Sequence, residues 1–271
     1  MTLAGVTVAV LGAGRMGSAI IRGLVSAGAS VVATGRRRET LERAARLGAE
    51  VTRSNSEAAR RAELVIIAVK PRNYPEVAAE IAPVVKGKTV ASIVAGVTLR
   101  ILDDTLPGAH NYRVMPNIGA LVMKSATAIA LRPGGSKGAN PGLVEEAFKT
   151  IGSVTWIPEE LMDAWTALAG SGPGFLAEVA DALILGGVAA GLPRREASAA
   201  VAQLFRAVAD LIESMHPAQL RDEVATPAGT TIAGLHSMHR WAPRRMMVDA
   251  VLSAYRRCRE LAGEVERSLR P

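Results

Sequence analysis

Short apolar runs alternate with amphipathic segments along the first half of the chain. Residues 6–11 (VTVAVL) form a continuous apolar, largely β-branched run that ends at Gly12, a pattern typical of a strand buried on both faces. The next segment, residues 15–27, predicts a helix because apolar residues recur in it at helical spacing. These residues are Met16, Ile20, Ile21 and Leu24. The alternation indicates right-handed crossovers and a parallel sheet.

The same alternation continues to about residue 158. Further strands are predicted at residues 30–34, 64–69, 89–94, 111–115, 127–131 and 153–157. Further helices are predicted at residues 39–47, 75–83 and 141–151. Residues 133–142 are predicted to form a long surface loop.

From residue 159 onward the pattern becomes helical. Helices are predicted at residues 159–169, 173–190, 195–215, 217–224, 230–238 and 243–267. The predicted fold is therefore α/β, with an N-terminal Rossmann-type doubly wound sheet and a C-terminal all-helical domain. We place the boundary near residue 160, which gives domains of residues 1–159 and 160–271.

The predicted helix around residues 176–191 is apolar on nearly every face, and Gly186 and Gly187 permit close approach of another backbone. A helix of this kind must be enclosed by other structure. The C-terminal domain alone is too small to enclose it. We therefore expect a partner subunit, and the alternative is that the N-terminal domain covers the helix.

Composition narrows the class of protein. Hydrophobic residues make up 49% of the 271 residues and aromatic residues only 3%, so the core must be built from Ala, Val, Leu and Ile. The one cysteine, Cys258, excludes an intramolecular disulfide and a thiolate metal cluster within this chain. This composition fits a reducing, cytoplasmic setting.

Neither a membrane nor a nucleic acid is the expected partner. The first residues lack a basic leader and a cleavage site, so we expect no signal peptide. The most apolar later run, residues 182–192, is shorter than the roughly 20 residues that span a bilayer. The net charge of +7 is not arranged as a basic helical stripe with interleaved aromatic residues. We attribute it to an arginine-rich surface and a site for a polyanionic cofactor.

The most informative motif is residues 12–17 (GAGRMG), which has the form G-x-G-x-x-G. It follows a predicted buried strand and opens a predicted helix, the context in which this pattern indicates dinucleotide binding. Gly12 permits the tight turn, Gly14 lets a pyrophosphate approach the backbone, and Gly17 permits close packing of helix on strand. Arg15 and Met16 share the helix N-terminus, whose N–H groups bind phosphate.

The residues after the second strand indicate which dinucleotide is bound. NAD-specific proteins place an acidic residue there to hold the ribose hydroxyls, whereas this chain has Arg36 and Arg37 and no acid before Glu39. A guanidinium binds a 2′-phosphate through charge-assisted hydrogen bonds worth about 1.5–3 kcal/mol each. We therefore predict that NADP(H) is preferred and that NAD(H) is also accepted, the alternative being that the arginines are a solvated helix start.

Two other motifs do not carry chemistry. His236 and His239 share a predicted helix, but no third ligand is evident, so we expect no metal site. Residues 170–172 (GSG) lie between helices, and Ala169 stands where a nucleophile elbow needs glycine.

Residues 222–235 (DEVATPAGTTIAGL) predict a turn that feeds a helix. Pro227 and Gly229 form the turn, and Thr230 or Thr231 is expected to cap the helix. A turn lined by hydroxyls at a helix N-terminus is either an anion site or a structural cap. Ala228 within it needs a negative φ or must tolerate mild strain.

In these motifs and their order, the chain resembles the pyrroline-5-carboxylate reductase family over almost its whole length. The blocks that carry the resemblance follow the family's order. They are residues 12–17, residues 68–71 (AVKP), residues 113–117 (RVMPN), residues 170–173 (GSGP) and residues 222–235.

The resemblance implies reduction of the cyclic imine Δ1-pyrroline-5-carboxylate to L-proline, the last step of proline biosynthesis. It also implies a homodimer formed through the C-terminal helices, or a larger ring of such dimers. Positions that match the family's cofactor cleft are Asn55, Ala68, Val69, Lys70, Pro71, Ala95, Gly96 and Asn117.

The resemblance places the substrate at the threonine turn. Thr226, Gly229, Thr230 and Thr231 match positions that hold the substrate carboxylate, and the Thr231 hydroxyl would also lie near the ring nitrogen. Thr231 is accordingly the candidate catalytic residue, with an orienting role. An iminium can arrive already protonated, so that catalysis would be mostly positioning.

Two departures from the family pattern leave the identity of the imine open. The residues concerned are Ile118 and Gly119 in place of Thr-Pro, and Ala169 and Gly174 around the GSGP block. A third departure, Ala228 in the turn, concerns only the backbone conformation. The alternatives are a reductase of a related cyclic imine and a non-catalytic NADP(H)-sensing protein. A hydroxyacid dehydrogenase is disfavoured because residues 159–191 lack the lysine that such enzymes need.

Overall fold

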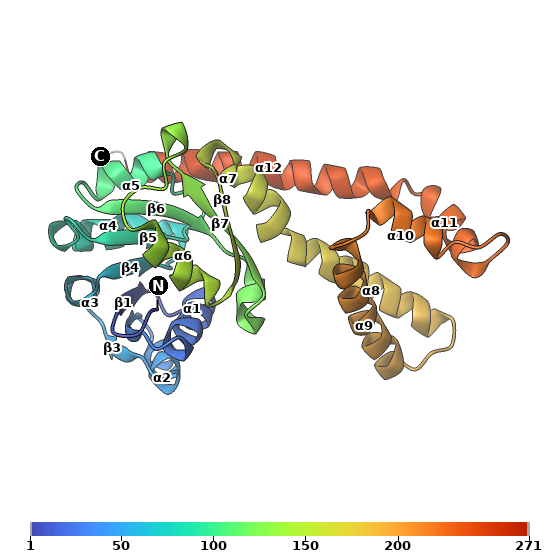
Figure 1. Ribbon diagram of the computed structural model, residues 1–271, viewed down its shortest axis with the longest axis horizontal. Helices are drawn as coiled ribbons and strands as arrows, with labels where there is room; N and C mark the ends of the chain where they lie inside the picture. The colour runs from blue at the N-terminus through green and yellow to red at the C-terminus, as the bar shows by residue number, and fades with distance from the viewer. Residues whose placement is uncertain (1, 270–271) are drawn as a thin grey trace. The chain divides into compact units, whose positions relative to one another are not determined.

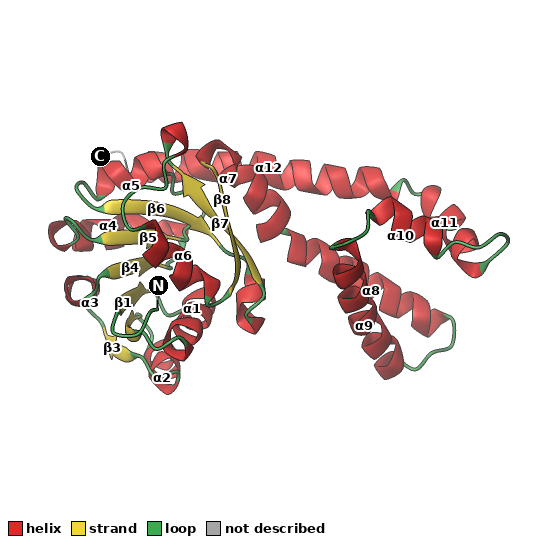
Figure 2. Ribbon diagram, in the orientation of Figure 1, coloured by secondary structure: helices red, strands yellow, loops and turns green. Residues whose placement is uncertain are grey.

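The computed structural model describes residues 2–269, and its N-terminal part is an eight-stranded sheet with helices on both faces (Figures 1 and 2). The strands are β1 Thr7–Leu11, β2 Ser30–Thr34, β3 Glu50–Thr52, β4 Leu64–Ile67, β5 Thr89–Ser92, β6 His110–Met115, β7 Ser125–Leu131 and β8 Gly152–Pro158. Their spatial order is β3-β2-β1-β4-β5-β6-β7-β8, which begins as in the doubly wound Rossmann fold. The predicted fold class is confirmed.

One strand pair corrects the expectation of a fully parallel sheet. β6 and β7 pair antiparallel, whereas every other neighbouring pair of the sheet is parallel. The connection between them, residues 116–124, contains only the 3₁₀ turn η3 Ile118–Val122. A parallel crossover takes about a dozen residues or more, so this short connection forces β7 to run back along β6.

The two faces of the sheet are covered by different helices because side chains alternate along each strand. Val8 and Val10 face one cluster, and Ala9 and Leu11 face the other. On the first face lie α1 Arg15–Ser26, α2 Arg38–Arg46 and α6 Pro141–Lys149. On the second face lie α3 Asn55–Arg61, α4 Tyr74–Ile81 and α5 Leu99–Thr105. Both faces are therefore buried, as parallel strands require.

The chain divides into two compact units. One unit extends to Ser171 and takes up the chain again at Ala254, and the other is Gly172–Ser253. The last part of α12 Pro243–Ser268 packs in the first unit, where a Cβ on Gly96 would lie 3.1 Å from the carbonyl oxygen of Leu261. The linear division into residues 1–159 and 160–271 remains a prediction about functional domains, and the compact units do not follow it.

The segment between β8 and the second unit is helical but irregular. It consists of the 3₁₀ turn η5 Glu159–Leu161, α7 Met162–Trp165 and a π-helical turn, η6 Thr166–Gly170. The second unit contains α8 Gly172–Ala189, α9 Arg194–Ile212, α10 Pro217–Glu223, α11 Thr230–His239 and the start of α12.

Helix α8 is strongly apolar and only partly covered, by α9, in the single chain. None of its residues is buried, and Leu176, Leu183 and Leu185 are 45–50% exposed. The helical segment Glu159–Ala189 has 31 residues, and an 18-residue window within it reaches a mean hydropathy of 1.3, enough by length and composition to cross a membrane. The length argument based on residues 182–192 does not apply to this longer segment, and its exposed leucines need some cover.

Candidate active site

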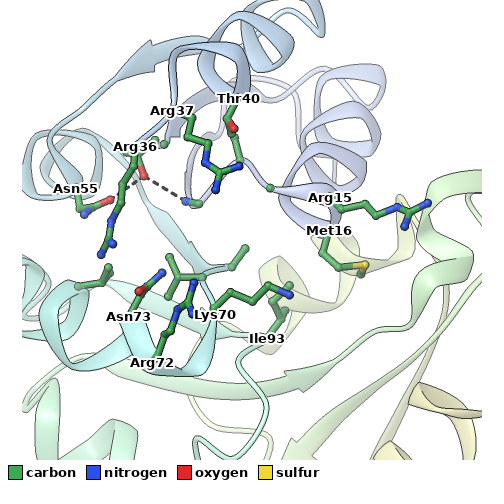
Figure 3. Close-up of a pocket in the computed structure, with 18 of the residues that line it drawn as sticks. Arg15, Met16, Arg36, Arg37, Thr40, Asn55, Lys70, Arg72, Asn73 and Ile93 are labelled. Atoms are coloured by element: carbon green, nitrogen blue, oxygen red, sulfur yellow. Dashed lines mark hydrogen bonds between the residues drawn. The ribbon is translucent and has the colours of Figure 1, made fainter.

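A pocket of about 880 Å³ lies at the carboxyl ends of β1, β2, β4 and β5. In a doubly wound sheet, ligands bind where the strand order reverses, which here is the boundary between β1 and β4. Figure 3 shows Arg36, Arg37 and Thr40 on one side of the pocket and Lys70, Arg72 and Asn73 on the other. The pocket is thus formed by loops that follow different strands.

The glycine loop has the backbone geometry that the motif predicts. Gly12 has a φ of +101°, and a Cβ there would lie 2.9 Å from the carbonyl oxygen of Ala68. A Cβ on Gly17 would lie 2.1 Å from the carbonyl oxygen of Gly12, so α1 can pack this closely on β1 only through glycine. A Cβ on Gly14 would meet nothing within 4 Å, because that residue faces the open pocket.

Helix α1 offers its first turn to the pocket. Gly14 is the N-cap and supplies no side-chain acceptor, and the first turn contains no acidic residue. The first N–H groups of a helix have no intrahelical acceptor, and the helix dipole adds positive potential at this end. The loop and the helix therefore form an anion-binding site of the kind that holds a pyrophosphate.

A chain of hydrogen bonds fixes the glycine loop from the side of β2. The Gly12 N–H donates to Thr34 Oγ1 at 3.2 Å, and Thr34 Oγ1 donates to Asn55 Oδ1 at 2.7 Å. Asn55 Nδ2 in turn donates to Glu80 Oε2 at 2.7 Å. Both polar atoms of the Asn55 carboxamide are engaged, so its orientation is set by Glu80. Thr34 and Glu80 were not among the predicted residues.

The lining of the pocket is strongly basic. The basic residues that line it are Arg15, Arg36, Arg37, Arg43, Arg53, Lys70 and Arg72. Among the described residues, the lining contains a single acidic one, Glu76, which forms an ion pair with Arg36. Such a lining suits a ligand that carries several negative charges.

Most of the predicted cofactor residues meet in this pocket. Those that line it are Gly12, Gly14, Arg15, Met16, Arg36, Arg37, Asn55, Ala68, Val69, Lys70, Pro71 and Ala95. Gly17, Gly96 and Asn117 do not line it. The lining also includes Thr40, Arg43, Arg53, Arg72, Asn73 and Glu76, which sequence reasoning missed. Arg72 and Asn73 follow β4 closely, so their position after a predicted strand could have identified them as lining residues.

Asn117 instead joins two turns near the end of β6. Its Nδ2 donates to the carbonyl oxygen of Ala169 at 2.9 Å, and its Oδ1 accepts from the Gly119 N–H at 2.9 Å. A Cβ on Gly119 would lie 2.4 Å from the carbonyl oxygen of Lys124, so glycine is needed there. The departures at Gly119 and Ala169 thus lie at one connection, between η3 and the π-helical turn.

A buried ion cluster fixes α7 against the sheet. The Arg113 side chain on β6 is 5% exposed and lies 2.6 Å from Asp163 and 3.6 Å from Glu159. Glu159 also accepts a hydrogen bond from the Leu99 N–H at 2.6 Å. Burial, and then the negative charge of Asp163, raise the pKa of the nearby Cys258 thiol, which keeps it protonated. The cluster is structural and adds no nucleophile.

The threonine turn in the second unit has an unusual backbone. Ala228 has a φ of +56°, so this residue adopts the strained left-handed conformation and not one with a negative φ. The Gly229 N–H donates to the carbonyl oxygen of Thr226 at 2.9 Å, and a Cβ on Gly229 would lie 2.2 Å from Thr226 Oγ1. Gly229 is the N-cap of α11, so the expectation that Thr230 or Thr231 caps the helix is wrong. Both threonines lie in its first turn.

The fold and the pocket together define a Rossmann-type dinucleotide-binding protein that carries a helical second unit. Comparison with known proteins specifies the family. A family model described as pyrroline-5-carboxylate reductase dimerisation matches residues 159–261, and one described as NADP oxidoreductase coenzyme F420-dependent matches residues 7–96.

Curated relatives cover nearly the whole chain. Pyrroline-5-carboxylate reductase from Methanosarcina acetivorans is 37% identical over 93% of this chain and 96% of its own length. The enzyme of the same name from Thermus thermophilus is 38% identical over 95% of this chain and 99% of its own length. The chain belongs to the pyrroline-5-carboxylate reductase family, as its motifs predict.

Solved structures have the same fold. 1-Pyrroline-5-carboxylate reductase from Streptococcus pyogenes aligns with a TM-score of 0.83 at 28% identity, covering 94% of this chain and 98% of its own. Pyrroline carboxylate reductase from Plasmodium falciparum, solved with NADP bound, aligns with a TM-score of 0.85 at 24% identity. The latter covers 96% of this chain and 99% of its own, and supports the fold alone.

Proposed function

We propose that the protein reduces Δ1-pyrroline-5-carboxylate to L-proline with NADPH as the preferred reductant. The observation that carries the proposal is the presence in one chain of a basic dinucleotide pocket and a pyrroline-5-carboxylate reductase dimerisation domain. The curated relatives of that name, which match over 93–95% of this chain, support the same activity.

The residues of the pocket fit a phosphorylated dinucleotide. The loop at Gly14 and the first turn of α1 would hold the pyrophosphate, and Arg36 and Arg37 would hold the 2′-phosphate. Val69, Lys70, Pro71 and Ala95 line the part of the pocket formed by the loops after β4 and β5. When bound, the reduced nicotinamide supplies the two electrons and the hydrogen that saturate the C=N bond.

Positions at the threonine turn would hold the substrate. The unpaired N–H groups in the first turn of α11, together with the hydroxyls of Thr226 and Thr230, suit a carboxylate. The Thr231 hydroxyl would orient the ring nitrogen and hydrogen-bond to it. Because the iminium form of the substrate already carries its proton, these residues act by fixing its position, which can contribute several kcal/mol.

The dimerisation domain indicates a homo-oligomer. We propose a homodimer, or a ring of dimers, in which partner helices cover the exposed leucines of α8. Such an interface accounts for the apolar segment Glu159–Ala189 without a membrane, and we propose that the protein works in the cytoplasm.

A screen of cyclic imines with both reductants tests the proposed function. We expect NADPH oxidation with pyrroline-5-carboxylate and a smaller rate, or none, with six-membered or substituted imines. Preference for another imine would assign the departures near Ile118, Ala169 and Gly174 to substrate choice. A protein that binds NADPH but turns over no imine would instead be a redox sensor.

A Thr231→Val variant tests the role of the hydroxyl within the same assay. It keeps the shape of the side chain and removes its hydrogen bond, so we expect kcat to fall by about tenfold or more. Thr231→Ser should restore most of the rate. An unchanged kcat in Thr231→Val would remove this residue from the proposed site.

A further inference from the structure

We propose that Glu76 weakens NADPH binding by competing with the 2′-phosphate for Arg36, and so sets the preference between NADPH and NADH. This inference rests on the proposed dinucleotide site. Glu76 is the only acidic residue in a described lining that contains seven basic ones. A carboxylate in such a pocket repels a polyanionic ligand. The position of the carboxylate determines which part of the ligand it repels.

The geometry places Glu76 opposite the residues that follow β2. Arg36 lies in the loop between β2 and α2, whereas Glu76 lies in the first turn of α4. The Arg36 guanidinium and the Glu76 carboxylate form an ion pair. The pair joins two sides of the pocket at the end where the adenosine ribose of a dinucleotide lies in this fold.

The ion pair is exposed enough to exchange. The side chains of Arg36 and Glu76 are 64% and 72% exposed, respectively. A pair of this kind contributes little to stability and opens readily. A 2′-phosphate that binds Arg36 must displace Glu76 or lie beside its negative charge. The 2′-hydroxyl of NADH carries no charge and meets neither cost. The carboxylate therefore penalises NADPH selectively.

The decisive variant is Glu76→Gln, which removes the charge and keeps the size of the side chain. The dissociation constants of NADPH and NADH are measured by fluorescence titration of the whole protein without any imine. We expect the constant for NADPH to fall about two- to fivefold, the range of an exposed ion pair, and that for NADH to stay the same. Glu76→Ala should act in the same direction.

A matched control separates the local effect from overall charge. Glu42 on α2 pairs with Arg38 four residues earlier, and neither residue lines the pocket. Glu42→Gln makes the same change in net charge and should leave both dissociation constants unchanged. In an Arg36→Ala background, Glu76→Gln should improve NADPH binding less than in the wild-type protein, because the contested group is absent and only the repulsion between Glu76 and the phosphate remains.

The possible results are distinguishable. Weaker NADPH binding in Glu76→Gln would mean that Glu76 aligns Arg36 for the phosphate, and no change would mean an inert surface pair; either overturns the inference and leaves the proposed function standing. Equal improvement by Glu42→Gln would also overturn it, since net charge would then be the cause. A wild-type protein that binds neither dinucleotide would overturn both.

Discussion

Gly14 and Gly17 belong to one motif, the first as the N-cap of α1 and the second within that helix, and they face opposite surroundings. A Cβ on Gly14 would extend into the open pocket, whereas a Cβ on Gly17 would lie 2.1 Å from the carbonyl oxygen of Gly12. Gly14 therefore serves the ligand and Gly17 serves the packing of α1 on the sheet. Charged residues also divide into a structural and a ligand-binding group. The buried guanidinium of Arg113 pairs with Asp163 and holds α7, whereas Arg36 and Arg37 line the pocket.

Alanine at these two glycines should separate binding from stability. Gly17→Ala must push α1 away from β1, which should lower the free energy of unfolding by about 1–3 kcal/mol. Gly14→Ala should leave stability intact and weaken NADPH binding by about tenfold or more, because the pyrophosphate can no longer approach the backbone. Urea unfolding and dinucleotide titration measure the two effects. A stable Gly17→Ala protein with full affinity would contradict the packing described here.

Removing the buried guanidinium should be costly. In Arg113→Met the carboxylates of Asp163 and Glu159 lose their cation, and we expect a loss of about 2–3 kcal/mol in the free energy of unfolding. This is less than for a fully buried pair because both carboxylates are about a quarter exposed. Arg61→Met, which breaks the exposed pair with Glu50, is the control and should cost clearly less than Arg113→Met. Equal losses of unfolding free energy in the two variants would show that burial of the guanidinium does not determine its contribution to stability.

At the scale of elements, α5 is joined to the end of β7 by a small polar cluster. Arg132 donates to both carboxylate oxygens of Asp103 at 2.9 and 3.1 Å, and Asn111 Nδ2 donates to the same carboxylate at 3.0 Å. Burial raises the pKa of Asp103, but the hydrogen bonds from Arg132 and Asn111 outweigh it and lower the pKa overall.

The lowered pKa predicts a pH-dependent contribution to stability. The folded-state pKa of Asp103 lies below its unfolded value of about 3.9, so the stabilisation is present above that pH and is lost as the pH falls through the folded-state pKa. Asp103→Asn should cost about 0.5–1 kcal/mol at neutral pH, discounted because the side chain is 42% exposed. Unfolding at pH 7 and near pH 3 should show the difference shrinking in acid. A constant difference would show that the charge does not matter.

Elements with a strong hydrophobic pattern are predictable from sequence, and the others are not. β1, β2 and β4 are apolar runs whose predicted and observed bounds agree within two residues. β3 was missed because it is short and its Glu50 and Val51 are exposed, and α3 (NSEAARR) was missed because its composition is polar. The π-helical turn η6 has no distinguishing local pattern, since it depends on packing.

Some residues of the candidate site were predictable from sequence and others were not. Residues that directly follow strands, such as Gly12, Arg36 and Lys70, were predictable because the carboxyl ends of parallel strands meet at one edge. Glu76 was not, because its place opposite Arg36 depends on how α4 packs across the sheet. Likewise, the return of α12 to the first unit links residues far apart in sequence and leaves no local signal.

At the scale of the whole molecule, the apolar surface of α8 requires a partner. Leu183 is 45% exposed in the single chain, and several neighbouring residues of α8 share this exposure. Leu183→Arg should shift the protein toward monomers, because an uncompensated charge inside an apolar interface costs several kcal/mol. Light scattering after size exclusion reports the mass. Val122→Arg, at a site 70% exposed in the first unit, is the control and should leave the mass unchanged.

The proposed activity is the reduction of pyrroline-5-carboxylate with NADPH. The most direct measurement follows NADPH absorbance and L-proline together when purified protein is given pyrroline-5-carboxylate. If this activity is correct, one L-proline forms for each NADPH oxidised. NADPH that binds without being oxidised, or is oxidised without formation of L-proline, would contradict it.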